Sequence, residues 1–365
     1  MKFSRYIIVA LALAAGLQAC RKETAGNDGL QPDKDHPIAW RASVQTKADA
    51  LLTTEALKTT PFGVQAYWTD KGVPYGGPGV TPYLDNRKVV YDSGEDIWEC
   101  DPKAWWLLGK QISFFAYAPW TDDPAVFKFA TDGTALLRGE FAQNDDPKLQ
   151  PDFLVAAPAL DKLMTGGPVP LTFKHALSNI RICLNITGDT EGHKFKLKSM
   201  SLGGVAGSGK FSYNTSAGGF TWDEIPRSDL SVRNKTYNLS IADGTLQDTW
   251  IKHVNDLTTE TGLDRYVWVN DVTGGKGELM LLPQPLTSIT ELTMNLDAYK
   301  DDGMGNWVYD STEAPFRLIL PAETSWEAGN IYYYTITLDV THRYIIQFGI
   351  TIQPWGSYSQ TVIYP

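Results

Sequence analysis

The chain has 365 residues and a formal net charge of −10 at pH 7. It contains no block of clustered lysine and arginine, so the charge argues against nucleic acid or an anionic lipid surface as partner. Its 12 Trp, 17 Tyr and 14 Phe, together with frequent Gly and Pro, favour strands and turns. At roughly 150 residues per domain, the length predicts two domains.

The beginning of the chain has the pattern of a secretory signal peptide. Two basic residues, an unbroken apolar run and a small residue follow one another: Lys2 and Arg5, Tyr6–Leu17, and Ala19. The apolar run is shorter than the roughly 20 residues of a membrane-spanning helix. We expect residues 1–19 to be removed and Cys20 to be acylated, which predicts an outer membrane lipoprotein at the cell surface. The alternative is an ordinary secretion signal, because Gln18 departs from the usual residue at that place.

The remainder of the chain divides by composition into a tether and two domains. Residues 20–36 are rich in Gly, Asp, Lys and Asn, so we expect a lipidated flexible tether with too little apolar surface to fold. Gly188–Gly192 is a polar break near the middle of the chain. We therefore expect an N-terminal domain at 37–187 and a C-terminal domain at 188–365.

Alternation of apolar and polar residues dominates the chain and predicts strands. In the first such run one face is apolar, namely Ile38, Trp40, Ala42 and Val44; later runs lie at 62–68, 112–118, 171–177, 180–186, 292–298, 316–320, 331–340 and 344–353. A change of parity near Ser178-Asn179 predicts a bulge or bend. A row of lysines alternating with Phe195 and Leu197 is typical of exposed strands that resist unwanted pairing.

Helical spacing occurs only in two short segments, 49–58 and 247–260. Many short strands separated by Gly- and Pro-rich turns predict an all-β fold with few short helices. The expected architecture is two β-sandwiches.

No motif argues for an enzyme, a cofactor or a metal site. Gly204–Lys210 matches a phosphate loop up to the lysine, but Phe211 stands where Ser or Thr would hold magnesium. We interpret it as a glycine-rich loop between strands. The five histidines lack metal-ligand spacing, and His175 is expected to be a hydrogen-bonded core residue. Cys100 and Cys183 either form a disulfide in an oxidising compartment or are two separately buried thiols.

Two neighbouring tryptophans offer a different function. If the backbone is extended there, Trp105 and Trp106 point to opposite faces, so one of them is expected to be exposed and to stack on sugar rings. The alternative function is therefore a monomeric glycan-binding lipoprotein. An exported hydrolase is the third possibility.

Several segments, in order, resemble those of the bacterial fimbrillin family, the subunits of protease-assembled pili on anaerobic Gram-negative bacteria. They are Phe62–Tyr67, Ile112–Pro119, Pro151–Ala156, Leu171–Ser178 and Trp326–Tyr334, with the late Trp355. The resemblance implies two tandem transthyretin-like β-sandwich domains. It also implies that the partners are other fimbrial subunits, a lipoprotein-processing enzyme, a trypsin-like surface protease and a host or bacterial surface ligand.

The resemblance further implies assembly by strand exchange, in which a protease removes the first strand and a segment of another subunit fills the groove. The displaced strand would carry Ile38, Trp40, Ala42 and Val44. Lys47 is the preferred cleavage residue because it lies between this strand and the next element, and Lys58 and Arg41 are the other candidates.

The donor segment would lie near the C-terminus, where Ile346, Phe348, Ile350 and Ile352 share one face. The alternative is that Tyr344–Gln353 is the last strand of the chain's own second domain, which leaves the tail containing Gln360–Tyr364 to donate. The expected function is a non-enzymatic, lipid-anchored fimbrial subunit or adhesin precursor.

Overall fold

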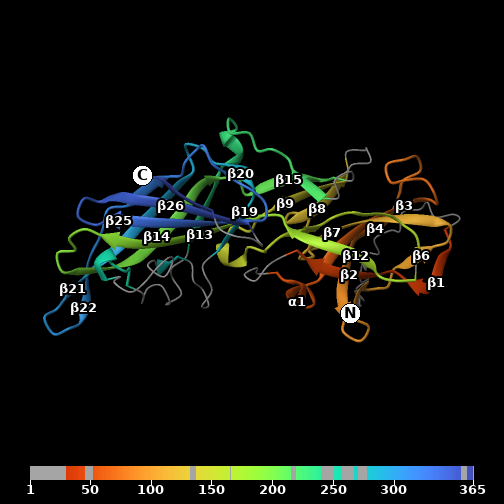
Figure 1. Ribbon diagram of the computed structural model, residues 1–365, viewed down its shortest axis with the longest axis horizontal. Coiled ribbons are helices and arrows are strands. Elements are labelled where there is room, and N and C mark those ends of the chain that lie inside the picture. Colours follow the sequence, from red (N-terminus) through yellow and green to blue (C-terminus); the bar gives the residue numbers. More distant parts are fainter. Residues whose placement is uncertain are drawn as a thin grey trace, which may run out of the picture.

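The computed structural model describes residues 30–45, 52–131, 137–164, 166–214, 219–239, 250–256, 267–269, 278–354 and 360–364. Nearly all regular structure in these residues is strand, so the predicted all-β fold is confirmed. The molecule is elongated, with the N-terminal strands at one end and the C-terminal strands at the other (Figure 1). The signal peptide, Cys20 and Lys47 lie outside the described residues. Within those residues, no helix is long and apolar enough to cross a membrane.

An eight-stranded sheet forms the N-terminal half, and it closes on itself. The strand order is β10-β12-β2-β5-β4-β3-β7-β11, and β10 also pairs with β7. All neighbours are antiparallel except β2 and β12, which are parallel. The strands are β2 (Ala39–Val44), β3 (Phe62–Asp70), β4 (Thr81–Asp92), β5 (Ile97–Cys100), β7 (Lys110–Ala118), β10 (Leu154–Ala156), β11 (Ala159–Lys162) and β12 (Val169–His175).

The closed sheet wraps around the first of three hydrophobic clusters, the N-terminal core. The predicted apolar face of β2 is confirmed, since Ile38, Trp40, Ala42 and Val44 are 1, 0, 3 and 9% exposed. Trp40 packs edge-on against Phe114 of β7, with ring centroids 5.6 Å apart. β2 therefore supplies one wall of this core.

Residues before β2 also belong to the folded part of the chain. β1 (Pro32–Pro37) pairs with β6 (Trp105–Leu107), and Leu30 packs against the N-terminal core. The composition of residues 20–36 predicts a flexible tether, but residues 30–36 find backbone partners and an apolar contact that composition does not reveal. Residues 20–29 lie outside the described part of the chain.

The helix expected at 49–58 is a single turn, α1 (Thr54–Leu57). Thr53 caps it, its side-chain oxygen accepting from the Ala56 N–H at 3.2 Å, and Leu57 is buried in the N-terminal core. The helical spacing at 247–260 corresponds, in the residues described there, to the 3₁₀ turn η3 (Val254–Asp256). Two further 3₁₀ turns are η1 (Pro147–Leu149) and η2 (Leu230–Val232).

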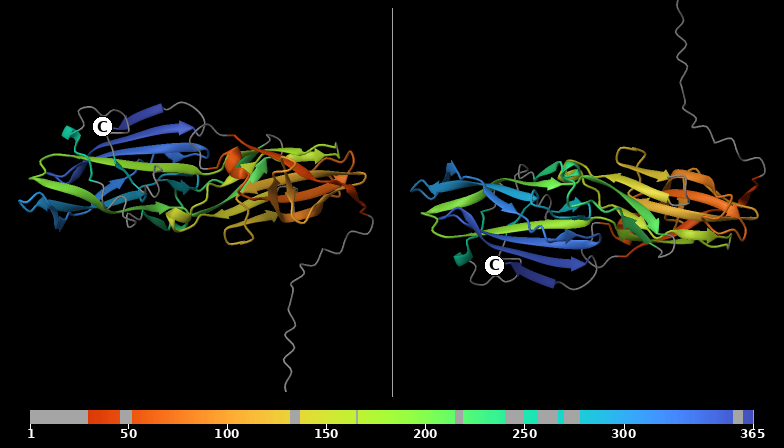
Figure 2. Two further views of the ribbon diagram at one scale, coloured as in Figure 1. Left: turned by 90° about the horizontal axis from the view of Figure 1, so that it is seen from below. Right: turned by 90° about the horizontal axis from the view of Figure 1, so that it is seen from above.

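Two sheets packed face to face form the C-terminal half, as Figure 2 shows in two views. Both contribute to the second cluster, the C-terminal core. One sheet contains β13 (Ser178–Thr187), β18 (Val267–Trp268), β19 (Leu279–Leu281), β25 (Asn330–Asp339), β26 (Tyr344–Pro354) and β27 (Gln360–Tyr364). The other contains β14 (His193–Val205), β17 (Lys235–Leu239), β21 (Glu291–Asp301), β22 (Trp307–Thr312) and β23 (Phe316–Ile319).

A four-stranded sheet joins the two halves. Its order is β16-β15-β9-β8, with β8 (Phe127–Thr131) and β9 (Leu137–Ala142) from the N-terminal half of the sequence and β15 (Ser208–Asn214) and β16 (Gly219–Trp222) from the C-terminal half. It covers the third cluster, the junction core, which is rich in aromatic rings from both halves. A two-stranded sheet of β20 (Gln284–Pro285) and β24 (Ser325–Trp326) lies beside it.

The parity change near Ser178-Asn179 is a change of sheet and not a bulge within one strand. β12 ends at His175 in the closed sheet, whereas β13 begins at Ser178 and pairs in parallel with β25 along its whole length. The expected boundary at 187 and 188 would separate β13 from the sheet to which it is bonded. The passage from one half's sheet to the other's therefore falls between His175 and Ser178.

Candidate functional site

The first predicted strand lies inside the closed sheet rather than at an edge. β2 occupies the position between β12 and β5, which we call the first-strand slot. Trp40 lies opposite Val169 of β12 and Val44 opposite Phe173, while the other edge of β2 pairs with β5. The Gln45 N–H extends the ladder by donating to the Phe173 carbonyl at 2.8 Å. Removing β2 would therefore break pairing on two sides and expose the N-terminal core.

The chain is held at both ends of the segment 46–51, which the described residues omit. The Val44 N–H donates to Thr54 Oγ1 at 3.0 Å, and the Leu52 N–H donates to Asp152 Oδ2 at 3.1 Å. Asp152 Oδ1 lies 2.9 Å from Nδ1 of His175, and both side chains are 1% exposed. His175 is thus a hydrogen-bonded core histidine, as expected, and its partner fixes the chain that follows the slot.

Two of the three predicted cleavage residues lie in hydrogen-bonded structure. Arg41 is in the middle of β2, opposite Pro170 of β12. Lys58 caps the C-terminus of α1, with Nζ 3.1 Å from Glu55 Oε1. A protease needs the substrate chain withdrawn from its own pairing, so cleavage at either residue requires local unfolding first. Lys47 belongs to the segment 46–51, outside the described residues.

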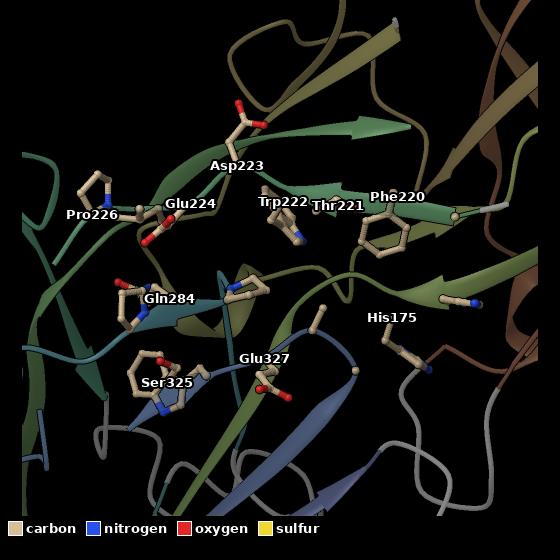
Figure 3. A pocket seen from close by; sticks show the side chains of 18 of the residues that line it. His175, Phe220, Thr221, Trp222, Asp223, Glu224, Pro226, Gln284, Ser325 and Glu327 are labelled. Atoms are coloured by element: carbon tan, nitrogen blue, oxygen red, sulfur yellow. The ribbon is translucent and has the colours of Figure 1, made fainter. Parts of the chain in front are cut away.

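A cleft of about 1360 Å³ lies where the slot ends, between the two halves, and we call it the waist cleft. Figure 3 shows β16, carrying Phe220 and Trp222, facing Glu327 across the opening. Trp222 is half-buried and its Nε1–H donates to the Ala176 carbonyl at 2.7 Å. The cleft is also lined by Gln45, the residue after β2, and by Pro354, the last residue of β26.

The waist cleft carries charges of both signs. Its exposed carboxylates include Glu224 and Glu327, and its exposed cations include Lys174 and Arg227. The Arg227 guanidinium donates to the Leu286 carbonyl at 2.7 Å, which holds it against the wall. This mixed lining, with half-buried rings, suits an extended peptide better than a single small ion.

The predicted donor strand is part of the chain's own C-terminal sandwich. β26 pairs with β25 on one edge and with β27 on the other. Phe348 and Ile350 are buried in the C-terminal core and Ile352 packs against it. The register shifts near Leu338, so that Ile345 also turns to the core; the side chain of Ile346 lies outside the described residues. The pairing favours the alternative that Tyr344–Gln353 completes its own domain.

The two tryptophans considered for sugar binding have different environments. Trp106 is 4% exposed and packs edge-on against Phe114, with centroids 6.0 Å apart, so its ring faces are not available to a ligand. Trp105 is half-buried, and its carbonyl accepts from the Tyr83 hydroxyl at 2.5 Å. β6 therefore serves mainly to pair with β1 and to fill the N-terminal core.

The remaining sequence motifs are structural. Cys100 and Cys183 are both free and buried, which agrees with the alternative of two separately buried thiols. Burial raises the pKa of the Cys100 thiol to about 12. Gly204–Lys210 spans the end of β14 and the start of β15, so only Ala206 and Gly207 form the expected connection between strands. Gly204 has φ +72 and a Cβ there would lie 1.9 Å from the Ile289 carbonyl oxygen, which explains the glycine by close approach of backbone.

The sequence does not reveal three residues that hold the slot. Thr54 and Asp152 accept backbone N–H groups from either side of residues 46–51, and Phe173 accepts from Gln45. The capping pattern Thr53-Thr54-Glu55 marks the helix start but not the bond from Val44. No local signal connects Leu52 to Asp152, because they are 100 positions apart.

The chain is similar to fimbrial proteins. A family model described as fimbrillin-like matches residues 46–355. A fimbrial protein from Bacteroides vulgatus has a similar structure, with a TM-score of 0.60 and 19% identity over 87% of this chain and 99% of that chain, which shows the fold. A candidate cell adhesion protein from Bacteroides ovatus has a TM-score of 0.44 and 15% sequence identity, and the match covers 90% of this chain and 98% of that chain. A fimbrial assembly protein from Parabacteroides distasonis has a TM-score of 0.36 and 11% sequence identity, and the match covers 90% of this chain and 99% of that chain. No curated protein matches this chain.

Proposed function

We propose, because this chain belongs to the fimbrillin-like family, that it is a precursor of a fimbrial subunit or adhesin assembled by donor-strand exchange. In this proposal a protease cuts the chain after Lys47, the N-terminal segment with β1 and β2 leaves, and an extended segment of another subunit enters the first-strand slot. Family membership supports other fimbrial subunits as partners and a cell-surface location.

The position of β2 carries the proposal. The strand is close to the N-terminus, precedes the candidate cleavage residue and fills an internal position of a closed sheet. Its buried face supplies Ile38, Trp40, Ala42 and Val44 to the N-terminal core. A vacant slot therefore presents two unpaired strand edges and an open core, which an alternating apolar strand from a second chain satisfies by β-augmentation.

The C-terminal tail is the proposed donor. β27 lies at the edge of its sheet and pairs with β26 alone among the described strands. β26 contributes Phe348 and Ile350 to the C-terminal core and pairs with both β25 and β27, so its withdrawal would break two ladders, whereas that of β27 would break one. We therefore assign donation to residues 355–365, with β26 retained.

The lipid anchor belongs to the same scheme. If Cys20 is acylated, cleavage after Lys47 separates the anchor from the folded subunit together with β1 and β2. A Cys20→Ser variant should then leave the membrane fraction even without the protease. Membrane retention equal to that of the unchanged chain would contradict acylation at Cys20, whatever the outcome of the assembly experiment.

Limited trypsin digestion tests the exchange. The full chain should yield a fragment beginning at Ala48 and, on incubation, a ladder of oligomers that resists SDS. Lys47→Gln should abolish both, whereas the matched Lys58→Gln should change neither, because Lys58 is engaged with Glu55 in α1. Loss of residues 1–47 without any oligomer would overturn the exchange, and a ladder formed by the uncut Lys47→Gln variant would do the same.

A further inference from the structure

The outer face of the β14–β21–β22 sheet carries aromatic side chains where a sheet exposed to solvent does not need them. On the inner face, Phe195 and Leu197 of β14 enter the C-terminal core. On the outer face, Lys194 lies opposite Tyr299 of β21, and Tyr299 lies opposite Tyr309 of β22. Trp250 and Trp307 complete this face. We call Lys194, Lys196, Trp250, Tyr299 and Trp307 the lysine–aromatic platform.

The platform is an alternating row of ammonium groups and rings. Lys194 Nζ lies 4.4 Å from the centroid of Trp307 and 5.4 Å from that of Trp250. Lys196 Nζ lies 4.7 Å from Trp250 and 5.2 Å from Tyr299. Trp250 also meets Trp307 and Tyr299 edge-on, with centroids 5.9 and 5.3 Å apart. These contacts fix the cations and the rings before any ligand arrives.

The lysines therefore do not protect a free strand edge, which is the role predicted from their alternation. In this stretch β14 is paired with β21 on one side, and on the other side the Ile251 N–H donates to the Phe195 carbonyl at 2.9 Å. Neither Trp250 nor Trp307 belongs to a hydrophobic core cluster of the described residues. Both are half-buried beside solvent.

A cleft of about 790 Å³ adjoins the platform. Its lining includes the two tryptophans and Lys194, together with a second group of nitrogen-bearing side chains: His193, Lys252 and His253. Asp189 and Asp256 also line it, so the cleft has both cations and hydrogen-bond acceptors. Among the described residues Lys194 forms no ion pair with a carboxylate, so its ammonium keeps donors for a ligand.

Ring faces beside ammonium donors suit a sugar that carries a carboxylate. The C–H face of a pyranose packs on an indole, hydroxyls bond to the aspartates, and the carboxylate takes charge-assisted bonds from lysine. A long polyanion is disfavoured, because the chain has a net charge of −10 and Asp297 and Asp310 flank the same face. The site is also remote from the first-strand slot, at the opposite end of the molecule (Figure 1).

We propose that the lysine–aromatic platform and its cleft form a binding site for short carboxylated oligosaccharides. Lys194 holds the carboxylate, and Trp250 and Trp307 hold the sugar faces. This function goes beyond strand exchange and does not depend on it, because it needs neither cleavage nor a second subunit.

Titration calorimetry on the full uncut chain tests the site. The probes are tetragalacturonate and its carboxyl-reduced neutral counterpart, in which each C6 carboxylate is replaced by a hydroxymethyl group. Tetragalacturonate should bind saturably, and both Lys194→Gln and Trp307→Leu should raise its Kd by at least about tenfold. Lys198→Gln is the matched control: it removes the same charge from the same strand, but its ammonium already lies 3.5 Å from Asp297 and 2.8 Å from Thr312.

Any one of several results would overturn the proposal. They are no saturable binding, equal binding of the neutral tetramer, equal losses in the Lys198→Gln control, and tighter binding of oligothymidylate or phosphatidylserine vesicles than of tetragalacturonate. If circular dichroism shows that Trp307→Leu does not fold, the Lys194→Gln variant alone tests the site. Lys194 points away from the core, so its substitution should leave the fold intact. Unchanged affinity in a folded Lys194→Gln variant would contradict the site.

Discussion

The strands β2 and β27, near the two ends of the described chain, occupy different kinds of position. β2 lies inside a closed sheet, paired with β12 along most of its length and with β5 at Ala39 and Trp40, whereas β27 lies at the end of an open sheet and pairs with β26 alone among the described strands. Loss of an internal strand breaks two ladders and opens a core, while loss of an edge strand breaks one ladder. The N-terminal half therefore depends more strongly on β2 than the C-terminal half depends on β27.

The sharpest test of this difference is Trp40→Ala, which should lower the free energy of unfolding by about 3–5 kcal/mol, as expected for truncating a fully buried tryptophan. Urea denaturation measures the loss. Trp105→Ala is the matched control, because that tryptophan is half-buried outside the slot, and it should cost much less. Equal losses in the two variants would remove the distinction between the slot and the rest of the closed half.

The two buried cysteines report strand loss directly. Cys100 lies in β5, beside the slot, and Cys183 lies in β13 of the C-terminal sandwich. Burial raises the pKa of both thiols, so neither forms the reactive thiolate readily. In a Cys20→Ser chain that is cut after Lys47 and freed of β2, labelling of Cys100 should accelerate about 100-fold, equivalent to about 2.7 kcal/mol, while that of Cys183 stays constant. Equal acceleration at both thiols would mean that the halves open together.

Deleting residues 355–365 should have a smaller effect on stability, less than about 3 kcal/mol, because one edge ladder is lost. Thermal unfolding checks this cost. In the assembly experiment the trypsin-cut deletion variant should accept a strand but donate none, so alone it stays monomeric. Normal ladders from this variant would assign the donor to another segment.

The smallest effect concerns the junction, where Arg181 bonds Glu278 and stacks on Tyr333. Burial raises the pKa of the Glu278 carboxyl above its ordinary 4.5, although Arg181 opposes this. Well below pH 4.5, the Glu278 carboxyl is protonated in both the folded and the unfolded chain. As pH rises from 4.5 to the raised pKa, the unfolded chain ionises first, so the free energy of unfolding falls. In the Glu278→Gln variant, this pH-dependent fall in the free energy of unfolding should be absent.

Glu140→Gln provides a control of opposite sign. Hydrogen bonds from Lys210 and Lys128 lower the pKa of the Glu140 carboxyl, so its stabilisation is present above pH 4.5 and lost as pH falls toward the lowered pKa. Denaturation curves across the acid range distinguish the two variants. The same pH slope in both would contradict the burial of Glu278 at the junction.

Local patterns predict much of the strand content but not the pairing. The alternation of Ile38, Trp40, Ala42 and Val44 identifies the buried face of β2, because side chains on a strand alternate with period two whatever its partner. That β2 runs parallel to β12 depends on contacts across about 130 positions, such as Trp40 with Val169. No period in the sequence encodes such a partner.

The same limit explains where the sequence analysis and the structure differ. Composition alone predicts a flexible tether at residues 30–36, whereas in the structure β1 forms backbone pairs with β6. The row that includes Lys194 and Lys196 resembles the protection of a free edge, because sequence does not reveal that Trp250 and Trp307 lie against these lysines. The cleavage and donor residues remain proposals, since they depend on a partner that a single chain does not contain.

The double ladder of β2 has a kinetic consequence. Cutting the chain after Lys47 breaks one covalent bond, but it leaves four buried side chains and both strand edges of β2 in place. The nicked subunit is therefore a stable complex of two fragments, with Leu52 still bonded to Asp152. The rate of fibre growth would then depend on how quickly an incoming strand displaces the old one. Under the proposed exchange, subunits would accumulate in the nicked form and polymerise only where donors are concentrated.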